Sequence, residues 1–415
     1  MAAAVQAPPS PVELAARAIE SFLRSSRQPQ LIEPGDPPIA LDAGSCQLTT
    51  APRWVTFEAW DKERLLSRRV AAVKHTSPGR LELTTLRFGG KPGSLFLLDA
   101  SRPRNEGLRR KGHRLVFGEQ FRQMLRHSYP GWTIRGLSTE ANLEESLSPS
   151  FPRALLTKGA AGWAAIAAPP SSNIDAVLAF GLIWLDYLRR RERKLAVHGL
   201  AVYLPGGTEQ TTILRVRHLN SAAGYAVFTY DEDAPPRQVD LQDCGNVHAH
   251  LERRIPPRET LPGPEALLEE QLRSQIALLD ARLRPSPVYG QVSATAAADR
   301  GILDLLAVDY SGRLAVIELK ASESIQLPLQ ALDYWIRVNR HLAEGDFPKR
   351  GYFEDIALHP APPRLLLAAP ATRFHPSNET VLRYFHPDIE VERIGLAHGW
   401  GGPVRVLFRH STMKA

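Results

Sequence analysis

Gly301-Ile-Leu-Asp-Leu-Leu-Ala-Val-Asp-Tyr-Ser-Gly-Arg-Leu-Ala-Val-Ile-Glu-Leu-Lys320 contains two β-prone runs on either side of a short polar segment. A glycine late in that segment is typical of a three-residue hairpin loop. A hairpin centred on Ser311 pairs Asp304 with Glu318. Because side chains alternate along a strand, Lys320 lies on the same face as these two acids.

The remainder of this hairpin is apolar on both faces, which is typical of strands inside a sheet that helices cover on both sides. Two carboxylates and a lysine at the ends of buried strands repel one another or lose hydration unless a cation completes the site. We therefore expect Asp304 and Glu318 to share a divalent cation. The alternative is a structural salt bridge, in which the two acids pair with Lys320 or with nearby arginines at the sheet edge.

Two predicted helices add polar residues to this hairpin. In the helix predicted over 328–341, Gln330 and Tyr334 lie one turn apart beside the buried stripe. In the helix predicted over 265–281, Glu265 lies on the core face and Glu269 on its flank. A glutamate on a core face needs a cationic partner, but Glu265 also stands in the first turn, where the helix dipole favours acids. Both explanations of Glu265 stay open.

In chain order, the helix glutamate, Asp304, Glu318-Leu-Lys320 and Gln330-x-x-x-Tyr334 resemble the PD-(D/E)XK nuclease superfamily. The branch with a Gln-x-x-x-Tyr motif includes the RecB-type nucleases and the carboxy-terminal domain of NucS-type endonucleases. The resemblance covers about residues 265–367, and Leu303 stands where the superfamily name puts proline. It implies a restriction-endonuclease-like fold, in which helices flank a mixed central sheet, and Mg²⁺-dependent hydrolysis of phosphodiester bonds in DNA.

The resemblance also implies a ligand set for the cation. Asp304, Glu318 and the carbonyl group of Leu319 would bind Mg²⁺ or Mn²⁺, together with a helix glutamate. Glu265 is the first choice for this glutamate and Glu269 the second. Carboxylate and carbonyl oxygens are the ligands that hard divalent cations prefer, and such cations activate water for attack on phosphate esters.

For the other residues, the resemblance implies that Lys320 orients the attacking water and that Gln330 and Tyr334 arrange the site or contact the nucleic-acid backbone. DNA is the expected substrate, and RNA or mixed structures stay open. Two other functions also stay open. One is a non-catalytic nucleic-acid-binding or scaffold protein, and the other is a nuclease subunit of a larger repair or restriction assembly.

An earlier part of the chain repeats the same order of predicted elements, which suggests an internal duplication. An ungapped alignment lays Trp163-Ala-Ala-Ile on Leu314-Ala-Val-Ile. It puts non-ligand residues at the three site positions of Asp304, Glu318 and Lys320, namely Arg153, Ala167 and Pro169. We therefore predict a degenerate copy that contributes packing, nucleic-acid contacts or an internal pseudo-dimer interface. Chance similarity between two α/β units is the alternative.

The predicted organisation has five parts. These are an N-terminal helix and loop (1–52), a small antiparallel β unit (53–101), the degenerate α/β copy (102–254), a proline-rich linker (255–264) and the nuclease-like domain (265–415). Within the degenerate copy we expect strands at His198–Leu204, Thr211–Arg217 and Gly224–Tyr230.

Charge and cysteine content limit the function classes further. The 415 residues carry a net charge of +7, and basic residues cluster at 102–114, 189–194 and 253–258, which suits a polyanionic partner. Each cluster taken alone also fits a solvated surface. The two cysteines, Cys46 and Cys244, are far apart, so we expect no disulfide framework and a cytoplasmic protein. The longest apolar stretch, 176–185, is too short to span a membrane.

Overall fold

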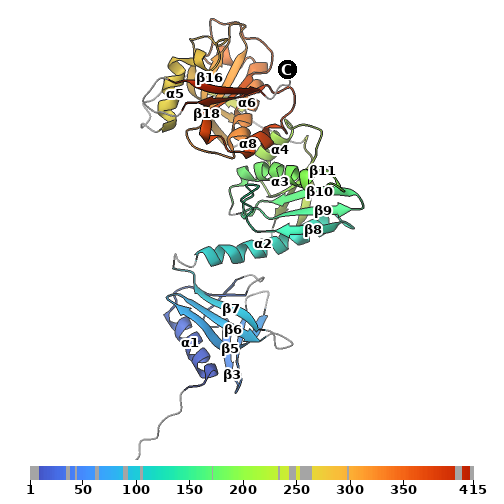
Figure 1. Ribbon diagram of the computed structural model, residues 1–415, viewed down its shortest axis with the longest axis vertical. Coiled ribbons are helices and arrows are strands. Elements are labelled where there is room, and N and C mark those ends of the chain that lie inside the picture. The colour runs from blue at the N-terminus through green and yellow to red at the C-terminus, as the bar shows by residue number, and fades with distance from the viewer. Residues whose placement is uncertain are drawn as a thin grey trace, which may run out of the picture. The chain divides into compact units, whose positions relative to one another are not determined.

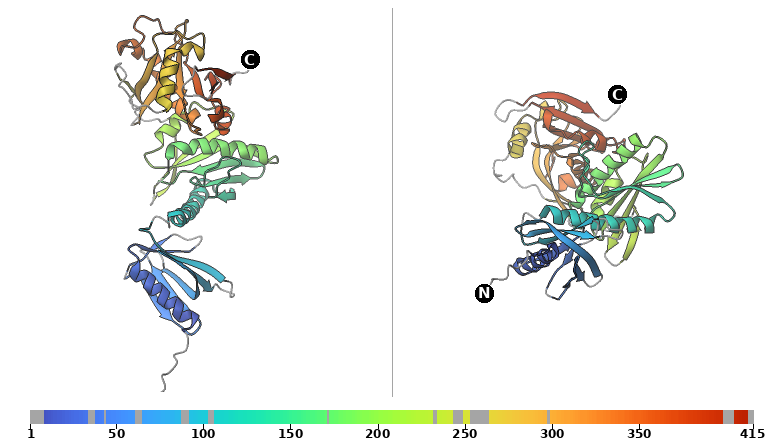
Figure 2. Two further views of the ribbon diagram at one scale, coloured as in Figure 1. Left: turned by 60° about the vertical axis from the view of Figure 1, so that its left-hand side comes forward. Right: turned by 60° about the horizontal axis from the view of Figure 1, so that its bottom comes forward.

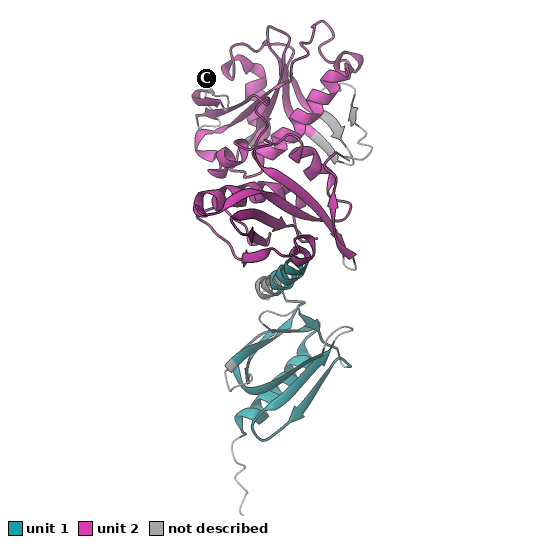
Figure 3. Cartoon of the chain, turned by 90° about the vertical axis from the view of Figure 1, so that its right-hand side faces the viewer, with its two compact units in different colours: residues 1–123 teal, residues 124–415 magenta. Residues whose placement is uncertain are grey.

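The computed structural model describes residues 9–33, 38–42, 44–60, 65–86, 92–102, 106–170, 172–231, 234–242, 249–252, 264–296, 299–397 and 404–411. The protein is a mixed α/β chain that divides into two compact units, residues 1–123 and 124–415 (Figure 3). Among the described helices, none combines the length and the hydrophobicity that a membrane span requires.

The first unit is an antiparallel sheet with one helix. Its strand order is β2-β1-β7-β6-β5-β4-β3, with bounds β1 (Pro29–Ile32), β2 (Ile39–Ala40), β3 (Cys46–Thr50), β4 (Val55–Trp60), β5 (Leu65–Ser77), β6 (Arg80–Leu86) and β7 (Pro92–Asp99). Helix α1 (Pro11–Ser25) begins with a capping box, in which Ser10 and Glu13 each accept a hydrogen bond from the other's backbone N–H. Its apolar face packs on one face of the sheet (Figure 1 and Figure 2).

The boundary predicted at residue 52 does not separate two parts of this unit. Strand β1 pairs with β7, and β3 pairs with β4, so strands from both sides of residue 52 belong to one sheet. Val12, Ile19 and Phe22 of α1 share a single core with that sheet. The short apolar runs before residue 52 gave too weak a periodic signal to be read as strands, and only pairing with β7 and β4 completes them.

The second unit begins with a six-stranded sheet of order β13-β12-β11-β10-β9-β8. The strands are β8 (Thr133–Ser138), β9 (Arg153–Lys158), β10 (Ala161–Ala167), β11 (Ala196–Pro205), β12 (Gly224–Asp231) and β13 (Ala234–Val239). Helix α2 (Glu106–Ser128) precedes them, and the division between the two compact units falls within it, after Gln123. The start predicted at residue 102 therefore lies ahead of this division.

Two helices connect the parallel strands of this sheet. Helix α3 (Val177–Arg191) follows a short 3₁₀ turn at Ile174–Ala176 and joins β10 to β11. Helix α4 (Gln210–Val216) joins β11 to β12. The strand predicted over 211–217 is therefore wrong. Its β-branched residues favoured a strand, but β11 and β12 are parallel, so the chain must cross back between them, and here it does so as a helix.

The second sheet has seven strands in the order β14-β15-β16-β17-β18-β19-β20. They are β14 (Ala249–Leu251), β15 (Tyr289–Ala296), β16 (Asp299–Val308), β17 (Leu314–Leu319), β18 (Arg364–Pro370), β19 (Val391–Leu396) and β20 (Val406–Ser411). Its helices are α5 (Pro264–Ser274), α6 (Leu327–Ala343), α7 (Asp346–Lys349) and α8 (Ser377–Leu382), with 3₁₀ turns at Ile276–Leu278 and Ala371–Arg373.

Strand β14 lies within the range predicted for the degenerate copy, 102–254, but it pairs with β15 of the second sheet. A strand belongs to the sheet that satisfies its backbone hydrogen bonds, whatever its place in the chain. Most of the linker, residues 255–263, lies outside the described residues, and Pro264 already belongs to α5.

The two sheets of the second unit share one topology. The pairings from β8 to β13 run antiparallel, antiparallel, parallel, parallel and antiparallel, and those from β15 to β20 run the same way. Helix α6 connects β17 to β18 as α3 connects β10 to β11, and α8 corresponds to α4. We call residues 133–239 the first copy and residues 264–411 the second copy.

The hairpins of the two copies differ by one residue in the turn. Lys158 pairs with Ala161 around a two-residue turn, whereas Asp309 and Arg313 close a three-residue turn in which Gly312 has φ of +86°. Beyond the turn, the ungapped alignment of the two copies is therefore out of register by one residue. In the first copy Arg153 pairs with Ile166.

This slip corrects two of the three predicted correspondences. Arg153 remains the counterpart of Asp304, but the counterpart of Glu318 is Ile166 instead of Ala167. By the same shift, the counterpart of Lys320 is Ala168 instead of Pro169. Ile166 and Ala168 are buried in the core on the α3 side of the sheet, so the first copy is apolar at the two positions where the second has Glu318 and Lys320.

The copies contact each other through equivalent helices. Helix α3 contacts α8, and α4 contacts α6, so each copy uses the same pair of elements. Between them, the Asn220 N–H donates to the Tyr384 carbonyl at 2.7 Å, and the His386 N–H donates to the His218 carbonyl at 2.9 Å. Reciprocal contacts of this kind are typical of a twofold dimer interface, which is the arrangement that the predicted internal pseudo-dimer requires.

Helices cover both faces of the second sheet (Figure 1). Leu306, Val316 and Leu365 pack in a core that includes α6 and also extends into the first copy. Leu305, Ile317 and their neighbours on the other face pack against α5. The expectation that the hairpin is buried on both faces is thus confirmed.

Candidate functional site

The β16–β17 hairpin brings the predicted acids together. Leu305 pairs with Ile317, and the same register places Asp304 opposite Glu318, as the sequence predicted. The Leu319 N–H donates to Asp304 Oδ2 at 2.7 Å. Lys320 follows directly after β17, and its Nζ lies 3.3 Å from Glu318 Oε1. The three side chains therefore form one cluster at the end of β17.

Glu318 is an unusual carboxylate because it is only 1% exposed and neither of its oxygens has a hydrogen-bond partner. The contact with Lys320 is close enough for an ion pair but is not aligned as a hydrogen bond. Burial raises the pKa of Glu318 well above its ordinary value, and the negative charge of Asp304 adds to this, while Lys320 opposes it. Burial therefore makes the charged form of Glu318 less favourable than in a free glutamate.

Asp304 and Lys320 respond to the same environment. Burial raises the pKa of Asp304, against the opposing hydrogen bond from Leu319. Burial opposes the charge of Lys320, but the nearby charges of Glu318, Asp304 and Glu265 hold the pKa of this lysine above its ordinary value. The cluster thus contains two buried acids and one cation, and further positive charge at the site would stabilise the charged forms of both acids.

Helix α5 contributes the two candidate glutamates. Glu265 is exposed, and its Oε1 accepts a hydrogen bond from the Ala321 N–H at 3.4 Å. Glu269 is half-buried, and its Oε2 accepts from Gln291 Nε2 at 3.4 Å. Burial raises the pKa of Glu269, and the charge of Asp304 adds to the effect. Neither glutamate brings a third carboxylate oxygen within 4.8 Å of both Asp304 and Glu318.

Gln291 is a site residue that the sequence did not reveal. It lies in β15 between Gly290 and Val292, which pair with the neighbours of Asp304. Its φ of +51° is in the left-handed region, which costs energy for a residue other than glycine. Such strain is found most often at functional sites. No signal in the sequence distinguishes this glutamine from any other strand residue.

Gln330 and Tyr334 of α6 face the cluster from the other side. Gln330 Nε2 donates to Tyr334 Oη at 3.2 Å. Tyr334 is buried, and burial together with the charge of Glu318 raises its pKa, so the phenol stays protonated at neutral pH. The guanidinium of Arg337 lies 5.8 Å from the Tyr334 ring. The polar pair predicted on this helix therefore reaches the site.

Further along α6, His341 belongs to a second group of polar side chains. Its Nδ1 lies 3.0 Å from Asp346 Oδ2, and with Glu344 these residues hold three ligand atoms within 4.8 Å of one another. Arg340 pairs with Glu344 at 2.9 Å and Lys349 with Asp346 at 3.4 Å. The acids of this group already have cationic partners, which is typical of a structural ion-pair network.

The donor set around Glu318 fits a hard divalent cation. Neither Glu318 oxygen has a hydrogen-bond partner, and Asp304 uses only one oxygen to accept from the Leu319 N–H. The atoms that remain free to bind a metal ion are therefore all oxygens. These are the ligands that Mg²⁺ and Mn²⁺ prefer, and a buried carboxylate without a partner is costly unless a cation binds it. Asp304, Glu318 and the Leu319 carbonyl are therefore the residues that could hold such an ion.

Comparisons with known proteins add little to this picture. No family model matches the chain, and no curated protein matches its sequence. A solved structure, the crystal structure of a repair endonuclease from Pyrococcus abyssi, covers 91% of this chain and 92% of its own at 9% identity. Its TM-score is 0.22. A score this low establishes no shared fold.

Proposed function

We propose that the protein is a metal-dependent nuclease that hydrolyses phosphodiester bonds of DNA and has its active site in the second copy. The observation that carries the proposal is the buried Glu318 carboxylate, whose two oxygens lack hydrogen-bond partners beside Asp304 and Lys320. This agrees with the order of acids and lysine that resembles the PD-(D/E)XK nucleases, in a restriction-endonuclease-like arrangement of sheet and helices.

A structural salt bridge explains the cluster less well. The same unit contains a buried structural pair, Arg215 with Asp333, in which both carboxylate oxygens accept hydrogen bonds, at 2.8 and 2.6 Å. Glu318 has no such partner, and Lys320 must serve two acids. Buried pairs stabilise a fold only when their geometry satisfies the remaining hydrogen-bonding groups. The cluster around Glu318 does not meet that condition.

A purely binding function also explains the acids less well. The first copy forms the same hairpin with Ile166 and Ala168 at the positions of Glu318 and Lys320, so packing does not require the charged residues. Buried acids would also repel a phosphate backbone in the absence of a cation. Their presence in the second copy alone supports a catalytic role there.

The proposed roles follow from position and charge. Asp304, Glu318 and the Leu319 carbonyl hold Mg²⁺ or Mn²⁺, with Glu265 or Glu269 completing the site. A bound cation of this kind stabilises charge on the phosphoryl group and makes water a better nucleophile. Lys320 holds a positive charge beside the acids, where it orients water and stabilises negative charge as the phosphate is attacked.

The α6 pair has a positioning role in this proposal. Tyr334 is protonated, so its hydroxyl can donate a hydrogen bond toward Glu318 or the substrate backbone, and Gln330 fixes its direction. The net charge of +7 suits a nucleic-acid substrate. Of the basic clusters, 253–258 lies outside the described residues, as do residues 103–105 of the first.

The deciding experiment compares cleavage of supercoiled plasmid, linear duplex, single-stranded DNA and RNA with Mg²⁺, with Mn²⁺ and with EDTA. Wild type should cleave DNA only with a divalent cation. Glu318→Gln, which keeps the shape and removes the charge, should lose about 10³-fold or more of the rate. Glu270→Gln is the matched control, because Glu270 is an exposed glutamate on the same helix as Glu265.

Equal cleavage by wild type and Glu318→Gln would refute the active-site assignment. Absence of cation-dependent cleavage of every substrate would favour the binding or scaffold function. Cleavage of RNA alone would change the substrate class but leave the site in place.

A further inference from the structure

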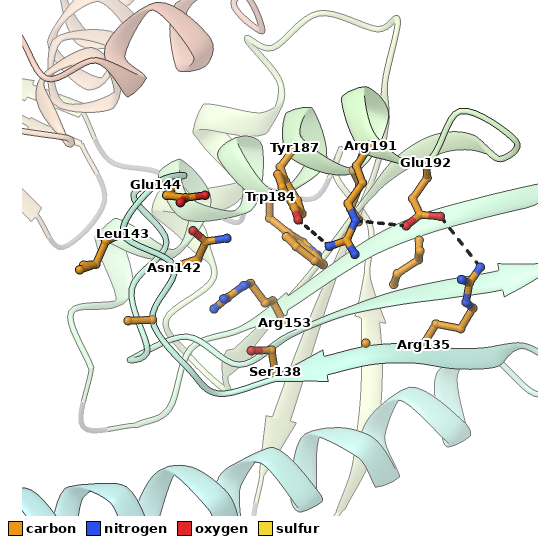
Figure 4. A pocket seen from close by; sticks show the side chains of 14 residues that line it. Arg135, Ser138, Asn142, Leu143, Glu144, Arg153, Trp184, Tyr187, Arg191 and Glu192 are labelled. Carbon is orange, nitrogen blue, oxygen red and sulfur yellow. Dashed lines mark hydrogen bonds and ion pairs between the residues drawn. The ribbon is translucent and has the colours of Figure 1, made fainter.

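The first copy contains a cavity at the place that corresponds to the catalytic cluster. Its volume is about 630 Å³, and its walls come from β8, the segment between β8 and β9, the start of β9 and helix α3 (Figure 4). Three arginines and two glutamates line it, namely Arg135, Arg153, Arg191, Glu144 and Glu192. Pockets of about 300–1,000 Å³ are the size range of small-ligand sites, and a nucleotide-sized group fits within it.

Arg153 is the buried charge of this cavity, and it is the counterpart of Asp304. It is 4% exposed. One guanidinium nitrogen donates to the Glu140 carbonyl at 2.8 Å and another donates to the Ser148 carbonyl at 3.4 Å, while Nε has no partner. Within the described part of the chain, no carboxylate forms an ion pair with Arg153. A buried guanidinium without an acid is costly unless an anion binds it.

Aromatic side chains hold this arginine in the cavity wall. The guanidinium of Arg153 lies 5.6 Å from the Trp184 ring, and Trp184 stacks with Tyr187 at 5.4 Å and 22° between the ring planes. Arg191 lies 5.6 Å from the Tyr187 ring and donates to its hydroxyl at 2.5 Å. Trp184 and Tyr187, on one face of α3, thus hold Arg153 of β9 and Arg191 of α3 in position. A binding site needs this kind of preorganisation.

The acids of the cavity do not neutralise Arg153. Glu192 lies 4.0 Å from both Arg135 and Arg191, so the rim charges pair among themselves (Figure 4). Glu144 is exposed. Arg153 remains as the positive charge that faces the interior without an acidic partner in the described residues.

We propose that the cavity of the first copy binds a phosphate group of a nucleic-acid strand, with Arg153 as its buried anchor. In the second copy the corresponding residue is an acid, which can approach a phosphate only through a cation. In the first copy a guanidinium makes that contact directly, with a donor geometry suited to phosphate oxygens. The choice of nucleic acid as the source of the phosphate rests on the proposed function, whereas the anion site rests on the cavity alone.

The test measures binding of a 3′-fluorescein-labelled, 5′-phosphorylated oligothymidine by fluorescence anisotropy, with the full chain and in EDTA so that no cleavage occurs. Arg153→Gln should weaken binding by about tenfold or more, the effect of losing a charge-assisted hydrogen bond. Arg153→Lys should recover part of the loss. Arg237→Gln is the matched control, because Arg237 is an exposed arginine of the same copy that neither lines the cavity nor belongs to the basic clusters. It should bind as wild type does.

A second variant guards against misfolding of Arg153→Gln, which circular dichroism and thermal melting would reveal. Ala141→Trp places a bulky group at an exposed position of the cavity lining and leaves Arg153 in place. It should weaken binding to a similar extent. If both variants fold and bind the oligonucleotide as wild type does, the proposal is wrong.

Competition separates the two sources of phosphate. If thymidine monophosphate or inorganic phosphate binds in a manner that depends on Arg153 while the oligonucleotide does not, the site takes a free phosphate and the nucleic-acid assignment is overturned. Glu318→Gln should bind the oligonucleotide like wild type in EDTA. Loss of cleavage in that variant with binding intact, or loss of binding in Arg153→Gln with cation-dependent cleavage intact, tells the two proposals apart.

Discussion

The two copies of the second unit share strand order, strand direction and connecting helices, yet they carry opposite chemistry at one position. The first copy has Arg153 facing Ile166 across its hairpin, and the second has Asp304 facing Glu318. Since the first copy forms the same sheet without either acid, the acids are not required by the fold. Under the proposed function, their burial is a cost that the second copy carries for its chemistry, as is common at functional sites.

The largest expected effect comes from giving the second hairpin the apolar character of the first. Glu318→Ile should abolish cation-dependent cleavage, and in EDTA it should leave the free energy of unfolding unchanged or raise it by about 1–3 kcal/mol, because an unsatisfied buried acid is replaced by an apolar side chain. Urea denaturation at neutral pH measures this. A loss of several kcal/mol would mean that Glu318 is structural and that the copies differ in packing.

A second variant tests the other charged difference. Lys320→Ala gives the second copy the residue that the first has at Ala168, and it should slow cleavage at saturating DNA by about 10²–10³-fold, the effect of losing one electrostatic stabiliser. Mn²⁺ binding, followed by its paramagnetic signal, should persist. If Lys320→Ala loses Mn²⁺ and cleaves normally once the ion is restored at high concentration, the lysine only supports the metal ligands.

The pH dependence of stability should distinguish the acid from its apolar counterpart. Burial and the Asp304 charge raise the pKa of Glu318 above its ordinary value of 4.5, so the folded state binds this proton more tightly than the unfolded state. Its contribution is therefore complete below pH 4.5 and falls as pH rises toward the folded pKa. Relative to Glu318→Gln, wild type in EDTA should lose stability across that window. If the difference in free energy of unfolding between wild type and Glu318→Gln does not change with pH, the pKa of Glu318 is not raised in the folded state.

The smallest effect is expected from the α6 hydroxyl. Tyr334→Phe removes the group that Gln330 orients and brings the site closer to the first copy, where α3 places Trp184 against the hairpin. Cleavage should slow by about two- to tenfold, the effect of one neutral hydrogen bond. Gln330→Ala should produce a similar change, and the double variant should add little, because both act through one hydroxyl. If the loss of cleavage rate in the double variant equals the product of the losses in the two single variants, the two residues act independently.

Much of the second copy could be predicted from its sequence. The apolar hairpin with a glycine in its turn fixed the register of Asp304 and Glu318, and the helical spacing of Gln330 and Tyr334 placed both on the site side of α6. These features depend on local backbone geometry, and the spacing of apolar residues along the sequence indicates that geometry directly. The catalytic roles of these residues stay predictions.

Other features depend on tertiary context and left no local signal. A turn shorter by one residue moved the counterpart of Glu318 to Ile166, since an ungapped alignment cannot register a change inside a loop. The helix at 210–216 reads as a strand until β11 and β12 are known to be parallel. The strained Gln291 and the aromatic wall behind Arg153 appear only once neighbouring strands and α3 are in place.

The reciprocal helix contacts between the copies have a practical consequence for dissecting the protein. Tyr384 and Phe385 of the second copy belong to the same buried cluster as Leu182 and Leu219 of the first. A fragment cut in the proline-rich segment would expose that apolar surface to water, so we expect that the second copy cannot be obtained as a soluble piece without redesigning the interface. Residues 124–415 form one compact unit that contains the whole cluster, so a fragment that retains this unit keeps the interface buried.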